Sequence, residues 1–190
     1  MTLPPYDPPV RPPVLPRTDL SYAVEDTVVG RLLLAVDTDG VLLTCAYAAT
    51  PALQDRWLQR LADTVSPRVL HRPADTDEAR RALTAYLSGE QRTVALPSAL
   101  TLATAFQRQV LTALEGIGYG EQASYGALAD TIGAPRAARA VGTALGGNPL
   151  CIVRPCHRIV PASGGTGGYA GGPEAKAYLL DLEARGRPQP

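Results

Sequence analysis

The clearest pattern in the first half of the chain is a pair of apolar, strand-like runs. They cover residues 31–37 and 41–47 and flank Asp39-Gly40. A polar residue followed by glycine between two such runs is typical of a β-hairpin. Cys45 lies in the second run, where a cysteine is most often a small, buried apolar side chain. We therefore expect a hairpin here, with no catalytic group in it.

Helical spacing replaces this pattern after the hairpin. Thr50-Pro51 predicts a helix start, because threonine caps a helix N-terminus and proline fits the first turn. Apolar residues then recur at helical spacing, at Leu53, Trp57, Leu58, Leu61 and Val65. A short strand at 68–70 and a second helix at 77–87 follow. The first half is thus predicted to be a small α/β unit, with Trp57 as a core anchor.

A polar-to-apolar connector at 91–103 separates this unit from a second set of helices. The pattern predicts a helix at 105–114, a short helix at 124–132 and, after Gly-Ala-Pro at 133–135, another helix at 136–145. A short helix, a tight turn and a second helix make a helix-turn-helix candidate. Antiparallel helix pairs are common, so this pattern alone is weak evidence for DNA binding.

The pattern in the last part of the chain predicts a strand, a loop and a helix. The apolar run at 150–153 reads as a strand, with Arg154 as an unexpected charge at its end. A glycine-rich loop at 164–172 leads to a final helix at 173–185, which has proline at its start and Gly186 just beyond its end.

Composition narrows the class of protein. The 190 residues include 18 Lys and Arg and 18 Asp and Glu, so the net charge gives no sign of a nucleic-acid partner. We find no signal peptide and no apolar run long enough to span a bilayer. The three cysteines and two histidines make neither a disulfide framework nor a four-ligand zinc site. These features favour a cytoplasmic protein with free thiols.

The N-terminal end differs from the rest by its proline content. Residues 1–17 are too rich in proline to form a helix or a sheet ladder, so we expect a disordered arm there. We divide the chain into this arm, an α/β domain at 18–96 and a helix-turn-helix domain at 97–190.

One cysteine is a candidate for chemistry. Cys156 is followed directly by His157, and a thiol is a strong nucleophile only as the thiolate, which a histidine can generate by taking the proton. Neighbouring side chains in an extended segment point to opposite sides, so we expect a bridging water or a sharp turn between the two groups. Glu183 is the best candidate to fix the histidine tautomer. On spacing alone, a Cys-His pair is usually incidental.

The helix at 136–145 is unusual because most of its side chains are small. They are Ala137, Ala138, Ala140, Gly142, Thr143 and Ala144. Such a helix either packs tightly against another helix or enters a DNA minor groove, which is only ~6 Å wide. Arg139 is the one long side chain in the middle, and it could fill the space of an extruded base.

Several short motifs of the second half occur in one order. They are Phe106-Gln107-Arg108-Gln109-Val110, Tyr119-Gly120-Glu121, Ser124-Tyr125, 137–142, Gly147-Asn148-Pro149, Pro155-Cys156-His157-Arg158, 168–172, Lys176, Leu179-Leu180 and Glu183. Together they resemble the O6-alkylguanine-DNA alkyltransferases, and the Pro-Cys-His-Arg block is the most specific of them. The first half resembles that family only through its hairpin-first α/β pattern.

The resemblance implies a direct-reversal DNA-repair enzyme that works once. It would transfer an alkyl group from O6 of guanine, and also from O4 of thymine, to Cys156. The implied fold is a ribonuclease H-like α/β N-terminal domain with a small antiparallel sheet, and a mainly α, winged helix-turn-helix C-terminal domain. The implied partner is double-stranded DNA, bound by a monomer through the minor groove. Such a displacement needs no metal and no cofactor.

The resemblance also implies a role for each site residue. In the catalytic set, Cys156 accepts the alkyl group, His157 deprotonates it through a water, Glu183 orients His157, Asn148 braces the turn and Tyr125 donates a proton to the leaving guanine. The base is held by Tyr125, the carbonyls of Cys156 and Ile159, Tyr169 and the N–H of Ala170. The DNA-contacting set is Arg139 as the finger, Ala137, Ala138, Ala140, Gly142, Ser124 and Gln107.

Three other functions fit less well. A non-catalytic, alkyltransferase-like lesion-binding protein would have another residue in place of Cys156. A cysteine hydrolase pairs its cysteine with a distant histidine and has other local motifs. A helix-turn-helix regulator would read the major groove with long polar side chains, which the helix at 136–145 almost lacks.

Overall fold

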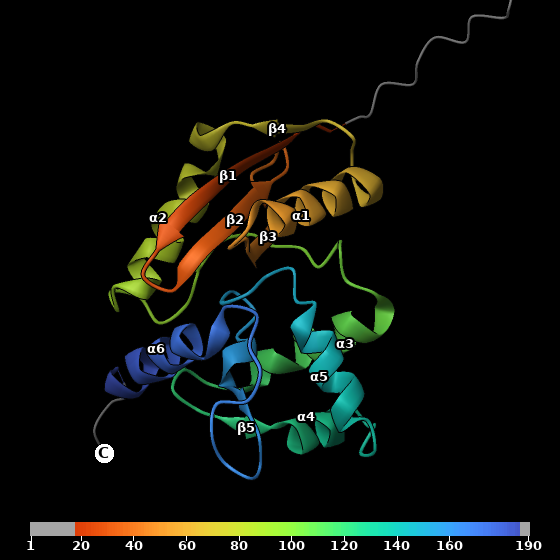
Figure 1. Ribbon diagram of the computed structural model, residues 1–190, viewed down its shortest axis with the longest axis vertical. Helices are drawn as coiled ribbons and strands as arrows, with labels where there is room; N and C mark the ends of the chain where they lie inside the picture. The colour runs from red at the N-terminus through yellow and green to blue at the C-terminus, as the bar shows by residue number, and fades with distance from the viewer. Residues whose placement is uncertain (1–17, 187–190) are drawn as a thin grey trace, which may run out of the picture.

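The computed structural model describes residues 18–186, and the proline-rich arm at 1–17 lies outside them. The N-terminal half contains a four-stranded sheet in the order β3-β2-β1-β4 (Figure 1). Its strands are β1 (Leu20–Thr27), β2 (Gly30–Val36), β3 (Leu42–Tyr47) and β4 (Val69–His71). The β1–β2 and β2–β3 pairs are antiparallel, but β1 and β4 are parallel. The sheet is therefore mixed, and the expectation of an antiparallel sheet was wrong at this edge.

The predicted hairpin is present as β2 and β3. Gly40 turns the chain with a φ of 76°, in the left-handed region that favours glycine. The carboxylate of Asp37 accepts the backbone N–H groups of Asp39 at 3.0 Å and Val41 at 2.9 Å, which fixes the turn. β1, which no pattern predicted, pairs along the other edge of β2.

Two helices cover opposite faces of this sheet. They are α1 (Pro51–Thr64) and α2 (Asp77–Leu87), which the single-turn η1 (Pro73–Thr76) precedes. Alternate residues of a strand point to opposite faces. Leu33 packs in one cluster with Leu61 of α1, whereas Leu32 and Leu34 pack in another with Leu83 of α2. Both faces are buried, which explains the nearly continuous apolar runs. Trp57 lies only partly buried at the edge of the α1 cluster.

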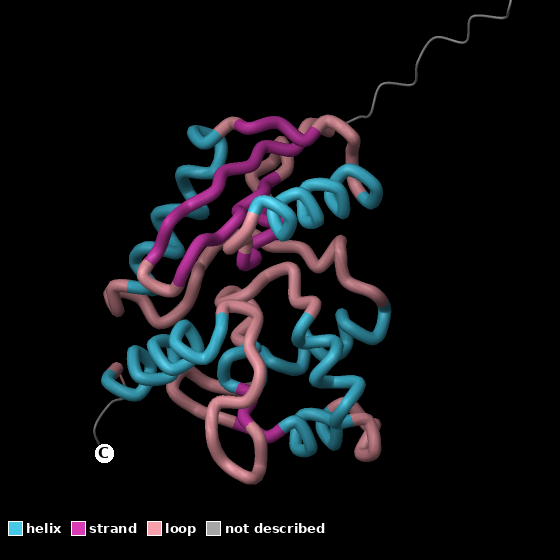
Figure 2. The backbone as a smooth tube through the Cα atoms, viewed as in Figure 1, coloured by secondary structure: helices cyan, strands magenta, loops and turns pink. Residues whose placement is uncertain are grey.

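The C-terminal half is mainly helical (Figure 2). Its elements are α3 (Ala105–Ala113), η2 (Leu114–Gly116), β5 (Ala123–Ser124), α4 (Tyr125–Thr131), α5 (Ala138–Gly146), η3 (Cys156–Arg158), β6 (Ile159–Val160) and α6 (Gly172–Arg185). Helix α5 begins two residues later than predicted. None of the helices within residues 18–186 has the length and apolar content that crossing a bilayer requires.

One core joins the two halves. The α2 face of the sheet packs in the same cluster as buried residues of α3, α4, α5 and α6. The main chain crosses the boundary too, because the N–H of Cys45 donates to the Pro149 carbonyl at 2.8 Å and the N–H of Cys151 donates to the Cys45 carbonyl at 2.7 Å. The segment that leads to Cys156 therefore rests on the edge of β3. The division at residue 97 stays a prediction.

The segment at 150–153 is not the strand that its apolar run predicted. It makes only isolated bridges, one from Leu150 to Cys45 and one from Cys151 to Arg154, and then turns back on itself. Ile152 has a φ of 72°, which is rare for a β-branched residue and strains the backbone. Tight turning here brings Cys156 back toward Asn148.

Candidate active site

Cys156 lies at the wall of a small cavity. The cavity has a volume of about 330 Å³ and is lined by Tyr125, Gly142, Leu145, Gly146, Cys156, Gly168, Tyr169 and Ala170. It is therefore bounded by the start of α4, the small-sided face of α5 and the glycine-rich loop. Only 6% of Cys156 is exposed. Its thiol can thus react with a group that enters the cavity, while bulk water is largely kept away.

Asn148 braces the turn that carries this thiol. Its side-chain Nδ2 donates to the Cys156 sulfur at 3.2 Å and to the Arg154 carbonyl at 3.0 Å. Its Oδ1 accepts the N–H of Leu150 at 2.9 Å. The amide is buried and uses both of its ends, so the geometry agrees with the bracing role expected of it.

The surroundings of Cys156 favour the thiolate. A hydrogen bond from Cys151 lowers the pKa of the Cys156 thiol, and burial opposes this effect. The amide of Asn148 and the positive charge of Lys176 lower the pKa further, so the pKa lies below its ordinary value. A thiolate is the nucleophilic form of cysteine. The contact with Cys156 and burial raise the pKa of Cys151, so that thiol stays protonated and can donate.

His157 stands beside Cys156 in the sharp turn η3, which is one of the two arrangements that the sequence predicts for this pair. Its Nε2 is 2.8 Å from Oε1 of Glu183, and both side chains are fully buried. Burial lowers the pKa of His157, although Glu183 opposes this, so the ring is neutral near pH 7. An ionised carboxylate only accepts, so the ring proton is on Nε2 and Nδ1 has the lone pair. Among the described residues, Nδ1 has no hydrogen-bond partner.

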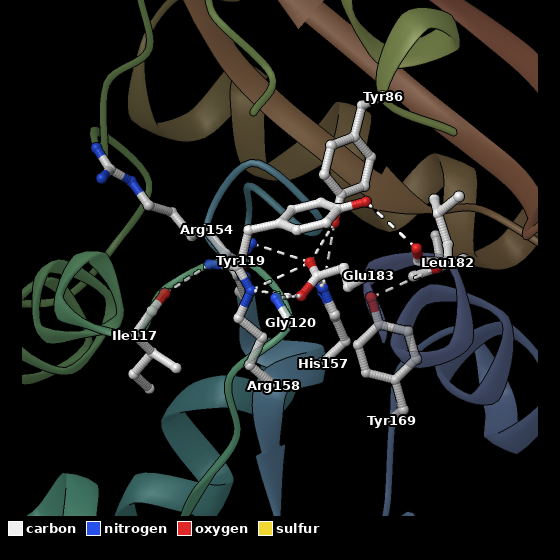
Figure 3. A network of polar contacts seen from close by, with 12 residues as sticks. Tyr86, Ile117, Tyr119, Gly120, Arg154, His157, Arg158, Tyr169, Leu182 and Glu183 are labelled. Atoms are coloured by element: carbon white, nitrogen blue, oxygen red, sulfur yellow. Dashed lines mark hydrogen bonds and ion pairs between the residues drawn. The ribbon is translucent and has the colours of Figure 1, made fainter. Parts of the chain in front are cut away.

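The carboxylate of Glu183 accepts hydrogen bonds from residues of several elements, as Figure 3 shows. Oε1 accepts from Tyr86, His157 and Arg158, and Oε2 accepts from Arg158 at 2.9 Å and from the N–H of Gly120 at 2.8 Å. Burial raises the pKa of Glu183, but hydrogen bonds from His157 and Arg158 outweigh this and bring it to about 2. The carboxylate is therefore ionised at any ordinary pH and holds His157 in one tautomer.

The groups expected to hold a base lie around the cavity. Tyr125 begins α4, and burial raises the pKa of its hydroxyl, which is thus a proton donor at neutral pH. Tyr169 and Ala170 also line the cavity. Ile159 lies in β6, and its carbonyl already accepts from the buried Nζ of Lys176 at 2.6 Å. A second lone pair of this carbonyl remains for a ligand.

The expected DNA-contacting residues divide into two groups. Arg139 and Ala140 are exposed on α5, while Ala138 and Gly142 of that helix and Ala137, its cap, are half-buried. Ser124 caps α4 by accepting the Ala127 N–H at 3.0 Å, which leaves its hydroxyl proton free to donate. Gln107 also bonds within the protein, and its contact with DNA stays a prediction. Its amide donates to the carbonyls of Ala144 at 3.3 Å and Gly147 at 3.4 Å, so it ties α3 to the end of α5.

The rest of the surface formed by residues 18–186 offers no comparable chemistry. An open depression of about 1080 Å³ runs along α2, but its lining residues include no cysteine or histidine. Within residues 18–186, no group of three or more His, Cys, Asp or Glu side chains is arranged to hold a metal ion. The volume of a cavity alone therefore does not identify the site, whereas its nucleophile does.

Sequence reasoning missed several residues of this site. Arg158 belonged to the quoted motif without a role, but it is buried and paired with Glu183 through both carboxylate oxygens. Cys151 and Tyr86 were not considered. The available signal for Arg158 was its place in the Pro-Cys-His-Arg block, directly after the predicted base. Nothing in the apolar spacing of α2 distinguishes the hydroxyl of Tyr86 from that of an ordinary core tyrosine.

Comparison with known proteins gives the same assignment as these motifs. The family model "6-O-methylguanine DNA methyltransferase, DNA binding domain" matches residues 105–185. The chain is also 37% identical over 164 residues to the methylated-DNA–protein-cysteine methyltransferase of Methanosarcina acetivorans, covering 85% of this chain and 97% of that protein. This chain belongs to the methylated-DNA–protein-cysteine methyltransferase family. It is also 41% identical over 165 residues to the regulatory protein Ada of Salmonella typhimurium, of which the match covers only 45%.

Solved structures of the methyltransferase family share the fold. A crystal structure of Mycobacterium tuberculosis OGT in complex with DNA aligns with a TM-score of 0.74 at 38% identity, over 88% of this chain and 95% of that one. The O6-methylguanine-DNA methyltransferase of Pyrococcus kodakaraensis aligns with a TM-score of 0.62 at 26% identity, over 86% and 98% of the two chains. The small sheet with helices and the helical second half thus form the architecture of this family.

Proposed function

We propose that this protein repairs DNA by transferring an alkyl group from O6 of guanine to the sulfur of Cys156. The observation that carries the proposal is a nearly buried thiol with a lowered pKa, placed at the wall of a cavity and backed by the neutral imidazole of His157 and the carboxylate of Glu183. Relatives named methylated-DNA–protein-cysteine methyltransferase support it. O4-alkylthymine, which presents a similar alkoxy group, is a second substrate of this proposal.

The reaction is a displacement at the alkyl carbon. His157 takes the proton of the Cys156 thiol on Nδ1, through a bridging water. The sulfur forms a bond to the alkyl carbon as the carbon–O6 bond breaks, and the electron pair of that bond passes to the guanine ring. Tyr125 donates a proton to the ring and regains one from His157. Alignment of the thiolate with the carbon lowers the barrier. The product is a thioether that water does not hydrolyse, so each molecule acts once.

The same proposal assigns the DNA interface to α4 and α5. The guanine must leave the base stack to reach a cavity of this size, which costs a few kcal/mol and less for a lesion that pairs poorly. The exposed Arg139 would occupy the vacated space, and the small side chains of α5 would let the helix enter the minor groove. Ser124 would donate to a phosphate. A relative's structure in complex with DNA supports this assignment.

The proposal also covers the fold class of each half, the oligomeric state and the cellular location. We assign the N-terminal half to the ribonuclease H-like class and the C-terminal half to the winged helix-turn-helix class, with α4 and α5 as the helix pair and β5–β6 as a minimal wing. We also propose a monomeric protein that acts in the cytoplasm. The three free cysteines support a reducing compartment.

Mass spectrometry tests the central step. After incubation with a duplex oligonucleotide that contains O6-methylguanine, we expect the protein to gain one methylene in mass, mapped to Cys156, while the Cys156→Ser protein gains none. In Arg139→Ala, transfer from the duplex should slow far more than transfer from free O6-benzylguanine, because the free base needs no flipping. A wild-type protein of unchanged mass, with tight binding to the lesion, would instead indicate the non-catalytic, lesion-binding function.

A further inference from the structure

A tyrosine of the N-terminal half reaches the residues that surround His157. Tyr86 lies near the end of α2 and is 1% exposed. Its hydroxyl donates to Oε1 of Glu183 at 2.5 Å, and its oxygen lies 3.4 Å from Nε2 of His157 (Figure 3). The ring is held edge-to-face against Tyr119, with 6.2 Å between ring centres. Contacts with the rings of Tyr119 and His157 and with the carboxylate of Glu183 thus fix the position of this tyrosine.

We propose that Tyr86 is a positioning residue for alkyl transfer, whose hydroxyl fixes Glu183 and limits how strongly that carboxylate attracts the proton on His157. The proposal rests on the proposed function, since it concerns the base of that reaction. It gives the α/β half of the protein a direct part in the chemistry of the helical half, because α2 supplies the hydroxyl and α6 the carboxylate.

The physical argument is competition for one oxygen. Oε1 of Glu183 accepts from Tyr86, from Nε2 of His157 and from the guanidinium of Arg158. Each donor takes part of the negative charge of that oxygen, so each weakens the others' hydrogen bonds. Without the hydroxyl, the carboxylate would attract the Nε2 proton more strongly and would stabilise the imidazolium. His157 would then stay protonated to a higher pH and would be unavailable as a base there.

The hydroxyl itself remains a donor at any relevant pH. Burial raises the pKa of Tyr86, and the negative charge of Glu183 raises it further. The ionisable groups around His157 come from four segments of the chain. They are Glu183 and Lys176 on α6, Cys156 and Arg158 on its own turn, Tyr86 on α2, and Tyr169 on the glycine-rich loop. The substitution Tyr86→Phe removes the hydroxyl that contacts Glu183 and leaves every charge around His157 unchanged.

A matched control exists at the same interface. Tyr178 of α6 donates its hydroxyl to the carbonyl of Leu87, the neighbour of Tyr86, at 3.0 Å. This hydrogen bond also ties α2 to α6, but it makes no contact with Glu183 or His157. Tyr178→Phe therefore removes one hydroxyl from the α2–α6 contact and leaves the acceptor oxygen of Glu183 untouched. If Tyr86 only ties α2 to α6, the two variants should affect His157 alike.

Nitrogen-15 NMR of the histidine rings tests the proposal without DNA. The chain has only two histidines, His157 and the exposed His71, so the signals are easily assigned. In Tyr86→Phe, we expect the Nε2 proton of His157 to move downfield at neutral pH. The protonation midpoint of His157 should rise by about one pH unit, because a hydrogen bond to a charged group is worth about tenfold or more in equilibrium. Signals of His71, and of both rings in Tyr178→Phe, should not move.

A second variant tests the same hydroxyl in case Tyr86→Phe does not fold. Site-specific replacement of Tyr86 by 3-fluorotyrosine keeps the ring and makes the hydroxyl a stronger donor, so the midpoint of His157 should fall. Identical His157 signals in the wild type, Tyr86→Phe and the fluorinated protein would overturn the proposal. So would equal shifts in Tyr86→Phe and Tyr178→Phe, since the effect would then belong to the interface.

Rates of transfer from O6-benzylguanine separate this proposal from the proposed function. If wild-type protein gains no adduct on Cys156, the proposed function fails, whatever the NMR signals show. If the wild type reacts, Tyr86→Phe should retain its rate at high pH. The acid limb of its rate profile should move up by about one pH unit, which means roughly tenfold slower transfer below the midpoint. A superimposable profile would refute the positioning role alone.

Discussion

Replacing Glu183 by glutamine tests the polar network more directly than any other single change. The side chain keeps its shape, but one carboxylate oxygen becomes an NH2 group. Every neighbour of that carboxylate is a donor: Tyr86, His157, Arg158 and the N–H of Gly120. At the Oε2 position the new NH2 would meet only the N–H groups of Arg158 and Gly120, and at the Oε1 position Tyr86 or His157 would have to turn or move its own proton to accept it. Arg158 would also lose the negative charge that compensates it in the interior.

The expected loss of stability is several kcal/mol. Removing one partner of a buried ion pair typically costs about 3–5 kcal/mol. The pKa of Glu183 gives a similar figure, because a fall from 4.5 to about 2 corresponds to roughly 3 kcal/mol at about 1.4 kcal/mol per pH unit. For a protein of this size, such a loss lowers Tm by about 6–20 °C. Out of a usual total of about 5–15 kcal/mol, that is a large share.

The pH dependence of this loss has a defined sign. A carboxyl whose pKa is lowered by folding stabilises the protein above its unfolded pKa, and this contribution disappears as the pH falls through its folded pKa. Urea unfolding followed by circular dichroism should therefore show the largest gap between wild type and Glu183→Gln above about pH 4.5. The gap should close between there and pH 2.

A surface carboxylate on the same helix is the matched control. Asp181 is exposed and pairs with Arg185. Its replacement by asparagine should change the free energy of unfolding by less than about 1 kcal/mol. If Glu183→Gln unfolded with the wild-type midpoint at pH 7, or if its deficit were the same at pH 2.5 and pH 7, the reasoning about the buried carboxylate would be wrong.

Two further substitutions test the hydrogen bond to the Cys156 thiol and the packing of the glycine-rich loop against β3. Cys151→Ala removes the hydrogen bond that lowers the pKa of Cys156, so thiolate formation should move to higher pH and alkylation of Cys156 by iodoacetamide at pH 7 should slow by about fivefold. Gly171→Ala would place a Cβ 2.3 Å from the nearest ring carbon of Tyr47, which packs edge-on against Tyr169 at 5.5 Å between ring centres. We expect a loss of about 1–3 kcal/mol in unfolding free energy and slower alkyl transfer.

Each of these changes has its own control. Cys151→Ser restores a donor and should return much of the iodoacetamide reactivity; equal slowing in both variants would show that the hydrogen bond is irrelevant. Gly116→Ala adds the same methyl group where no heavy atom lies within 4 Å, so its stability should stay within about 0.5 kcal/mol of wild type. Equal losses in the two alanine variants would contradict the overlap with Tyr47.

Much of the fold and of the site could be predicted where local sequence governs local structure. The caps at Thr50 and Ser124, the turn at Gly40 and the glycine after α6 all act over a few residues, and the corresponding elements are present. The proximity of His157 and Glu183, at 2.8 Å, agrees with the motif-based expectation, although their roles stay predictions.

What could not be predicted depends on partners distant in sequence. β1 has an indistinct period because Ser21, Glu25 and Asp26 interrupt its apolar positions, and it is a strand because β2 and β4 pair with it. The run at 150–153 looks like a strand, yet its main chain is bound to β3 and forced into a turn. Tyr86 resembles any core residue of α2 until the fold places Glu183 opposite it.

The shared core has a consequence for how such a protein can be altered. The α2 face of the sheet packs against the helical half, and the segment before Cys156 is hydrogen-bonded to β3. Either half alone would therefore expose apolar residues and unpaired main-chain groups. Exchange of either half between relatives would have to conserve the contact as well as the catalytic motif. Substitutions on the α2 side of the sheet, which packs in one cluster with α3, α4, α5 and α6, should therefore be tolerated only when the helical half changes with them.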